Sequence, residues 1–124
     1  MCMRNEKLLP PLGPYSHYKI AESFVFVSGQ IPQDNNGNIL SGDSIEAQTE
    51  LALTNLSNVL TCAGSSLDKA VKVNIYLTDF SLFDRMNAIY RKFFESGSFP
   101  ARCCVEVSGL AEGVLIEIDA VATL

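Results

Sequence analysis

The sequence predicts an α+β protein in which two helices cover one face of a mixed β-sheet. Three observations lead to this fold class. Strand and helix patterns follow one another in an order typical of α+β domains. The chain has 124 residues, 48% of them hydrophobic, which suits one core rather than two. The strands carry apolar residues on both sides, although only two helices are available to cover them. We therefore expect residues 1–124 to form a single domain.

The first half of the chain is expected to contain a hairpin and a long helix. Two β-rich runs, residues 15–21 and 24–30, are separated by a two-residue turn and precede a loop rich in Asn, Asp and Gly. From Asp43 onward, apolar residues recur at helical spacing until Gly64. Glu46 stands three residues after Asp43, as in a variant of the capping box. This pattern predicts a helix of about five turns.

The second half is expected to contain a strand, a helix and two further strands. Residues 71–77 alternate between apolar and polar side chains, which is typical of a strand with one buried face. A helix with a broad apolar stripe follows and begins near Thr78 or Asp79. Two β-runs, residues 102–107 and 115–123, are joined by a short loop and are expected to pair as antiparallel neighbours. With three strands before the long helix, the mixed sheet would have six strands.

Composition and charge narrow the classes of function. The formal net charge is −5 and no run of basic residues occurs, so the attraction that supplies most non-specific affinity for nucleic acid or anionic lipid is missing. No apolar stretch reaches the roughly 18 residues of a membrane-spanning helix, and the N-terminus lacks the apolar core of a signal peptide. We expect a cytoplasmic protein that binds neither nucleic acid nor membranes.

The four cysteines favour free thiols over a metal site or a disulfide framework. Cys2, Cys62, Cys103 and Cys104 include no CxxC pair and no Cys/His cluster, so no zinc site is expected. Cys103 and Cys104 are neighbours on a strand, and their side chains therefore point to opposite faces. We expect all four thiols to be free.

The uncovered face of the sheet predicts an oligomer. Phe24 and Phe26 alternate with Val25 and Val27, so both faces of this strand are apolar. Two helices can cover only one face, and an exposed apolar sheet face usually marks an interface. We expect a homo-oligomer that packs through this face or its edge.

Charged residues that interrupt apolar strands indicate where chemistry could occur. In the last strand, Glu117 and Asp119 share the face opposite the apolar residues, and in the preceding strand Arg102 shares a face with Cys104 and Glu106. If the two strands pair, Arg102 and Glu117 lie together on the helix-free face, in a cleft between subunits. There Arg102 could bind a small carboxylate bidentately while Glu117 acts as an acid or base. Alternatively, the two residues form a salt bridge between strands or subunits.

Residues near the first hairpin are weaker candidates. Tyr15 follows Gly13-Pro14, which fixes the backbone and could direct the phenol into a cleft; alternatively, Tyr15 is an aromatic plug at a turn. Ser28 and Gly29 end a strand with a hydroxyl and with a residue that lets a ligand approach the backbone, or they form a bulge. His17 is the only histidine and has no partner Ser or Cys at a recognisable spacing, which favours a packing or surface role.

Two more candidates come from the second half of the chain. Asn87 lies beside the apolar stripe of the second helix, where a lone Asn is usually solvated or bonded locally. Cys104 shares the face of Arg102 and could be a nucleophile, although a buried thiol that packs as an apolar group is more common. On its own, neither residue indicates a site.

Several motifs occur together in the order typical of one family. They are Gly13-Pro14-Tyr15-Ser16, Ser28-Gly29-Gln30-Ile31-Pro32, Met86-Asn87-Ala88-Ile89-Tyr90, Phe99-Pro100-Ala101-Arg102-Cys103-Cys104-Val105-Glu106-Val107 and Ile116-Glu117-Ile118-Asp119-Ala120. From about Leu12 to Leu124, the chain resembles the RidA/YjgF/YER057c/UK114 family of reactive enamine/imine deaminases. The resemblance implies a chorismate-mutase-like α+β fold and a homotrimer whose sheets form a central barrel, with active sites in clefts between subunits.

The resemblance also implies an activity and a set of site residues. Members of the family act as 2-iminobutanoate/2-iminopropanoate deaminases. They hydrolyse enamine and imine intermediates such as 2-aminoacrylate, which pyridoxal-phosphate dehydratases release, to 2-keto acids and ammonia, and they need no metal or other cofactor. By motif, Arg102 corresponds to the arginine that binds the substrate carboxylate and Glu117 to the glutamate that positions water or transfers protons. The substrate-binding residues implied in the same way are Tyr15, Ser28, Gly29, Asn87 and, through its backbone, Cys104.

Two positions depart from the family pattern, and other functions compete with deamination. His17 and Cys103 stand where relatives commonly have Gln and Ser, and both flank proposed site residues. The same Arg102 would also serve a non-catalytic regulatory trimer that binds small carboxylates. Some family members are described as ribonucleases or translation inhibitors, and the net charge of −5 argues against this function.

Overall fold

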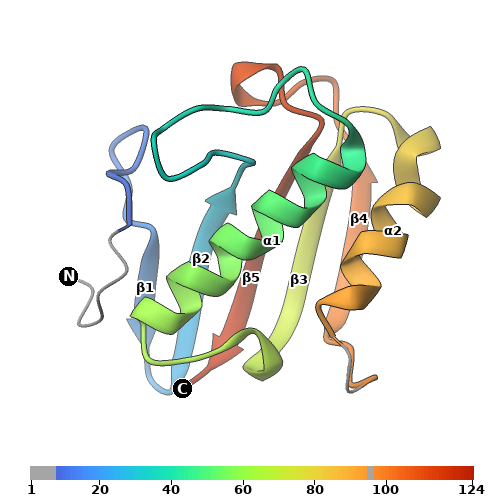
Figure 1. Ribbon diagram of the computed structural model, residues 1–124. Helices are drawn as coiled ribbons and strands as arrows, with labels where there is room; N and C mark the ends of the chain where they lie inside the picture. Colours follow the sequence, from blue (N-terminus) through green and yellow to red (C-terminus); the bar gives the residue numbers. More distant parts are fainter. Residues whose placement is uncertain (1–7, 95–96) are drawn as a thin grey trace.

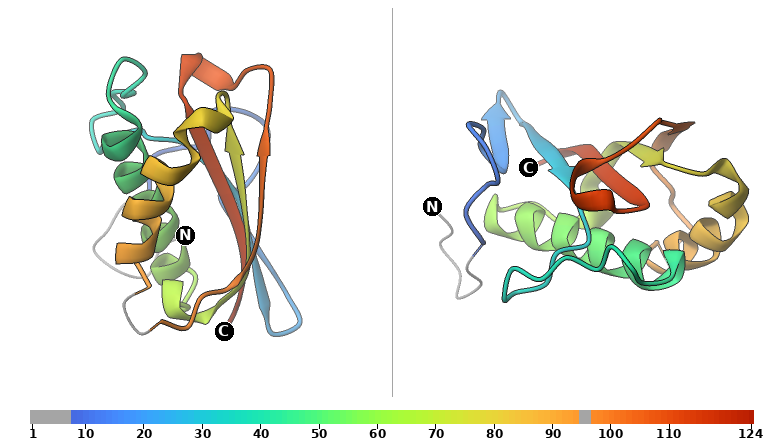
Figure 2. Two further views of the ribbon diagram at one scale, coloured as in Figure 1. Left: turned by 90° about the vertical axis from the view of Figure 1, so that its right-hand side faces the viewer. Right: turned by 90° about the horizontal axis from the view of Figure 1, so that it is seen from above.

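The computed structural model describes residues 8–94 and 97–124, and Figure 1 shows how their elements are arranged. The strands and α-helices are β1 (Tyr18–Ala21), β2 (Phe24–Gln30), α1 (Ile45–Cys62), β3 (Ala70–Leu77), α2 (Phe83–Lys92), β4 (Ala101–Glu106) and β5 (Ile116–Thr123). Short 3-10 helices are η1 (Leu67–Lys69), η2 (Phe80–Leu82) and η3 (Ala111–Gly113). Figure 2 shows that α1 and α2 lie on the same side of the sheet. The α+β class and the covering of one face by both helices are therefore confirmed.

The strands form one mixed sheet in the order β1-β2-β5-β3-β4. β1 and β2 form the expected antiparallel hairpin, and β5 lies between β2 and β3, antiparallel to both. β4 pairs in parallel with β3 at the edge of the sheet. The prediction that β4 and β5 are antiparallel neighbours is wrong, because α2 is the crossover of a β3-α2-β4 unit and returns the chain to the far side of β3.

The sheet has five strands, not the expected six. Between β2 and α1, residues 31–44 form no strand and make only one isolated bridge, between Gln33 and Ile39. The Asp34 carboxylate accepts hydrogen bonds from the backbone N–H groups of Asn36 and Asn38, both at 2.9 Å. These bonds close the chain into a turn and prevent it from continuing as a third N-terminal strand.

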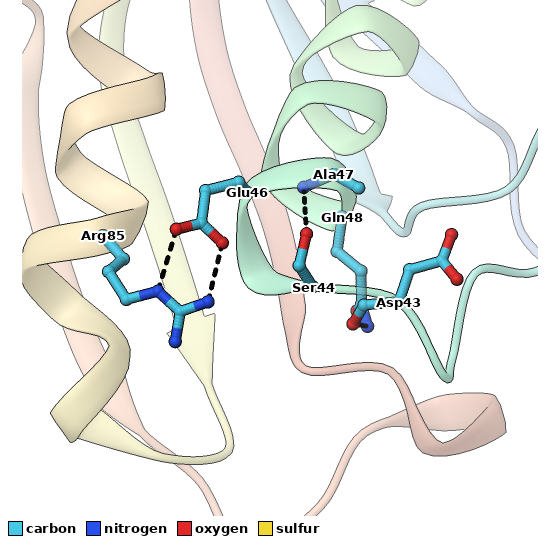
Figure 3. A network of polar contacts seen from close by, with 6 residues as sticks. All are labelled: Asp43, Ser44, Glu46, Ala47, Gln48 and Arg85. Atoms are coloured by element: carbon cyan, nitrogen blue, oxygen red, sulfur yellow. Dashed lines mark hydrogen bonds and ion pairs between the residues drawn. The ribbon is translucent and has the colours of Figure 1, made fainter.

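The start of α1 differs slightly from the expected capping box. Ser44, not Asp43, is the N-cap, and its Oγ accepts a hydrogen bond of 3.1 Å from the backbone N–H of Ala47 (Figure 3). The Glu46 carboxylate does not close a capping box. Its two oxygens instead accept hydrogen bonds of 2.8 Å from Nε and Nη2 of Arg85 on α2. The exposed ends of the two helices are thus joined by a bidentate ion pair.

The core lies between the helices and the inner face of the sheet. The residues of β5 that face the helices are Ile116, Ile118, Ala120 and Ala122, all of them buried. Glu117 and Asp119 alternate with these residues and lie on the opposite, helix-free face, as the pattern of β5 predicts. The strand next to the C-terminus therefore supplies both a central part of the core and two carboxylates outside it.

A buried glutamine connects α1 to the segment that enters β5. Gln48 is fully buried, and its Nε2 donates hydrogen bonds to the backbone carbonyls of Ser41 and Asp43 at 3.4 and 3.0 Å. Its Oε1 accepts a hydrogen bond of 2.8 Å from the backbone N–H of Leu115. Because buried polar groups are costly when they lack a partner, these bonds hold the two segments together.

The helix-free face of the sheet exposes large apolar side chains. Phe24 and Phe26 on β2 are 40% and 47% exposed, whereas Val25 and Val27, which point to the helices, are buried. Val105 of β4 pairs with Tyr76 and is 42% exposed on the same helix-free face. Two helices therefore leave apolar sheet surface uncovered, as predicted.

The cysteines are only partly as expected. Cys103 and Cys104 carry free thiols. Cys62, near the end of α1, is disulfide-bonded, so the prediction of a free thiol is wrong at this position. Cys2 lies outside the described residues. A disulfide depends on two Cα atoms lying within about 7 Å, and spacing along the sequence does not reveal that distance.

No helix in residues 8–94 and 97–124 is long and apolar enough to cross a membrane.

Candidate functional site

The sequence-predicted site residues lie mainly around two separate cavities. The first, here called the Glu117 pocket, has a volume of about 470 Å³ and is lined by Leu12, Tyr15, Ser28, Gly29, Ile31, Ala111 and Glu117. The second, here called the Arg102 pocket, has a volume of about 230 Å³ and is lined by Asn87, Tyr90, Arg91, Phe99, Pro100 and Arg102. Four of the predicted residues therefore share the first pocket and two share the second.

The Glu117 pocket contains a carboxyl group with an altered pKa. Burial raises the pKa of Glu117, and the negative charge of Asp119, two residues along β5 on the same face, raises it further. Asp119 is held in place by hydrogen bonds from Asn74 Nδ2 at 2.8 Å and from the Tyr76 hydroxyl at 2.9 Å. A carboxyl group that retains its proton more readily than usual is suited to acid and base roles in turn.

Gly29 makes room for the Glu117 side chain. A Cβ atom built on Gly29 would overlap Glu117 Oε2 and lie only 2.7 Å from its Cδ. The glycine therefore lets the β2 backbone and the carboxyl group approach each other, a role that the sequence did not suggest. The neighbouring Ser28 hydroxyl donates a hydrogen bond of 2.6 Å to the carbonyl of Ser16. Tyr15, 46% exposed, follows the expected tight turn, in which its N–H donates to the Gly13 carbonyl at 2.8 Å.

Arg102 is positioned by α2. Its Nη1 donates a hydrogen bond of 2.8 Å to Asn87 Oδ1, and its Cζ lies 4.7 Å from the ring centre of Tyr90 and 5.5 Å from that of Phe83. Within residues 8–94 and 97–124, Arg102 forms no ion pair. Among these residues no carboxylate compensates the positive charge of the guanidinium group, which lies beside the pocket and so suits binding of a small anion.

The prediction that Arg102 and Glu117 share the helix-free face is wrong within one protomer. Arg102 is the parallel partner of Val73, whose side chain is buried under the helices, whereas Glu117 pairs with Tyr76 on the other face. The error follows from the expected pairing of β4 with β5, which β3 prevents. An ion pair between the two residues within one protomer is excluded for the same reason.

The remaining candidates are not among the residues that line these two pockets. Cys104 is half-buried on the face of Arg102 and packs against the core; burial raises the pKa of its thiol more than Arg102 lowers it, which makes it a poor nucleophile. His17 lines a separate cavity of about 160 Å³, where its Nε2 forms a hydrogen bond of 2.6 Å with the Leu9 carbonyl. Cys103 is exposed on the other face of β4. The two departures from the family pattern thus line neither main pocket.

Sequence reasoning missed two aromatic residues that contact Arg102. Phe83 and Tyr90 flank Asn87 on α2, and positions 83, 87 and 90 lie on one face of a helix. The sequence contained this spacing, but it also fits an ordinary apolar stripe that packs on a sheet. Among the described residues, no group of three or more His, Cys, Asp or Glu side chains could hold a metal ion.

The fold and the two pockets define a class: a small α+β protein with one pocket suited to an anion and another that carries an acid/base carboxyl. The chain belongs to the YjgF/RidA family, because the family model described as endoribonuclease L-PSP matches residues 5–124. Among curated relatives, a RutC family protein of Pyrococcus abyssi is 46% identical over 118 residues, which is 94% of this chain and 91% of the relative.

Solved structures agree with this family. The Rid family protein YyfA of Yersinia pestis superposes with a TM-score of 0.88 at 39% identity, covering 92% of this chain and 90% of the other. TdcF of E. coli, solved with bound serine, superposes with a TM-score of 0.87 at 33% identity, covering 92% and 91% of the two chains.

Proposed function

We propose that this protein is a 2-iminobutanoate/2-iminopropanoate deaminase. It hydrolyses reactive enamine and imine intermediates, such as 2-aminoacrylate, to 2-keto acids and ammonia. The observation that carries the proposal is the Arg102 guanidinium group, which is half-buried beside a pocket and has no carboxylate partner in the described residues. Leaving such a charge unpaired is costly unless a ligand completes the site, and every substrate of this class carries a carboxylate.

The proposed active site requires two copies of the chain. Arg102 and Glu117 lie on opposite faces of one sheet, so they can meet around one small substrate only if different protomers supply them. The exposed apolar residues Phe24, Phe26 and Val105 on the helix-free face give a surface on which copies could pack. In the proposed homotrimer, the sheets form a central barrel and each cleft combines the Arg102 pocket of one protomer with the Glu117 pocket of the next.

The proposed reaction is hydrolysis of a C=N bond. The enamine first tautomerises to the imine, whose carboxylate binds the Arg102 guanidinium group. Glu117 takes a proton from a water molecule as the water oxygen bonds to C2, and it gives that proton to the nitrogen as the C=N π bond opens, which forms a carbinolamine. Glu117 then takes the proton of the new hydroxyl group and passes it to the nitrogen, so that the C–N bond breaks, ammonia leaves, and C2 becomes the carbonyl carbon of the 2-keto acid. In this site Tyr15, Ser28, Asn87, the backbone near Gly29 and that of Cys104 hold the substrate.

A regulatory trimer that binds small carboxylates is the second candidate. The presence of serine in the TdcF structure favours the regulatory function, because serine, like the imine substrates, carries a carboxylate but has no C=N bond to hydrolyse. Nuclease activity, which the description of the family model names, fits poorly with a net charge of −5.

A competition assay tests the proposal. A serine or threonine dehydratase is run with semicarbazide, which traps the imine, and with wild-type protein, Arg102→Ala or Glu117→Gln. We expect the wild type alone to accelerate release of the keto acid and to decrease the semicarbazone. Sedimentation of each variant checks that assembly is unchanged. Identical curves for all samples would overturn the proposed enzyme activity. If the wild type also binds a keto acid, the result would favour the regulatory trimer.

A further inference from the structure

We infer that Phe83 and Tyr90 are positioning residues that hold the Arg102 guanidinium group by cation–π contacts and so keep its N–H groups free for a substrate carboxylate. The inference rests on the proposed function of Arg102 and concerns which contacts hold its side chain in position for the substrate. Both aromatic residues come from α2, whereas Arg102 comes from the edge strand β4. The contact therefore aligns the helix with the strand at the pocket.

The geometry fits a cation held by aromatic faces. The Arg102 Cζ lies 4.7 Å from the ring centre of Tyr90 and 5.5 Å from that of Phe83, both within the roughly 6 Å typical of such contacts. Asn87, between them on the same helix face, accepts one hydrogen bond from Nη1. A guanidinium group has five N–H donors in its plane, and contacts of its Cζ with ring faces occupy none of them.

Arg85, which lies on α2, shows the contrasting arrangement. Arg85 donates from Nε and Nη2 to both carboxylate oxygens of Glu46, at 2.8 Å each (Figure 3). That pair occupies the edge of the guanidinium group and neutralises its charge. An aromatic ring does neither, because it attracts the cation through its quadrupole and carries no net charge. Arg102 is thus fixed in place but remains able to bind an anion.

The Tyr90 ring is itself held firmly. Tyr90 is 4% exposed, and its ring centre lies 4.8 Å from that of Phe94 and 6.5 Å from that of Phe99. Its hydroxyl group is buried and has no hydrogen-bond partner among the described residues. The ring, not the hydroxyl group, is therefore the part of Tyr90 that acts on Arg102.

Matched substitutions separate this role from a structural one. Tyr90→Leu and Phe83→Leu remove a ring, whereas Tyr90→Phe keeps it. Phe80→Leu is the control, because Phe80 stacks on Phe83 with ring centres 4.7 Å apart but makes no cation–π contact with Arg102. Each variant is tested for binding of 2-oxobutanoate by calorimetry, for kcat and KM of imine hydrolysis, and for thermal unfolding.

We expect each Leu variant at positions 83 and 90 to raise both the Kd for 2-oxobutanoate and the KM by about 2- to 30-fold, with kcat nearly unchanged. Tyr90→Phe and Phe80→Leu should bind as the wild type does. Folded Leu variants with wild-type Kd and KM would overturn the inference and leave the proposed function standing. If the wild-type protein binds 2-oxobutanoate but does not hydrolyse imines, the proposed enzyme activity is overturned. The Kd values of the variants alone would then decide the inference. Absence of both wild-type binding and hydrolysis would overturn both proposals.

Discussion

Gly29→Ala is expected to lower kcat about 100-fold while the protein stays folded. The added Cβ would overlap Glu117 Oε2 and lie 2.7 Å from Cδ and 3.1 Å from Cγ, whereas ordinary contacts begin near 3.4 Å. The carboxyl carbon must therefore move by about 0.7 Å and its oxygen by more, and a displacement of about 1 Å is enough to cost roughly two orders of magnitude in rate.

The same substitution should affect stability only slightly. The atoms that collide are at the end of a flexible side chain, so Glu117 can rotate away without moving the backbone. Gly29 is not among the described glycines with a positive φ, and alanine can adopt its backbone conformation. We expect a small change in Tm and a much smaller effect on binding of 2-oxobutanoate than on kcat, since Arg102 is proposed to bind the carboxylate of this ligand.

The assay is imine hydrolysis in competition with semicarbazide, with kcat, KM and Tm measured for each protein. Gly42→Ala is the matched control, because a Cβ atom at Gly42 meets nothing within 4 Å. A folded Gly29→Ala variant with wild-type kcat would refute the argument that the position of the Glu117 carboxyl limits the rate. Loss of folding in Gly29→Ala but not in Gly42→Ala would instead assign Gly29 a structural role.

Three other substitutions give further tests. Asp119→Asn removes a negative charge that raises the pKa of Glu117, so that pKa should fall and the acid limb of the pH–rate profile should move to lower pH; an unmoved limb would contradict the coupling. Gln48→Leu leaves the N–H of Leu115 without its partner and should lower the free energy of unfolding in urea by about 1–3 kcal/mol, whereas no loss would show that the bond is dispensable. Phe26→Asp places a charge on the helix-free face and should reduce the sedimenting mass to that of a monomer; an unchanged mass would exclude this face as the interface.

Local patterns predicted the elements well, because they depend on neighbouring residues. The alternation in β5 assigned Glu117 and Asp119 to the face opposite the core, since side chains in a strand alternate with a period of two residues. The helical spacing after Asp43 predicted α1 to within two residues at its start, although the N-cap is the next residue, Ser44. The motifs that resemble the family led to the same fold class and to the family to which the chain belongs.

Pairing between distant segments could not be predicted in this way. The turn at Asp34 removed the expected sixth strand, and the disulfide at Cys62 depends on a distance that spacing does not reveal. For the candidate site, the sequence identified Arg102 and Glu117 but placed them on one face of the sheet.

The sequence by itself determined which residues carry charge, because charge follows from residue type. It also determined which segments alternate as strands and which are helical, because the apolar pattern follows the period of each element. Only the tertiary structure decided that α2 returns β4 to the far side of β3, parallel to it. That crossover turns Arg102 toward the helix side, where Phe83 and Tyr90 contact it, and away from Glu117. The physical reason is that the face of a side chain relative to another strand depends on the order and direction of pairing, which is set by packing of the whole chain.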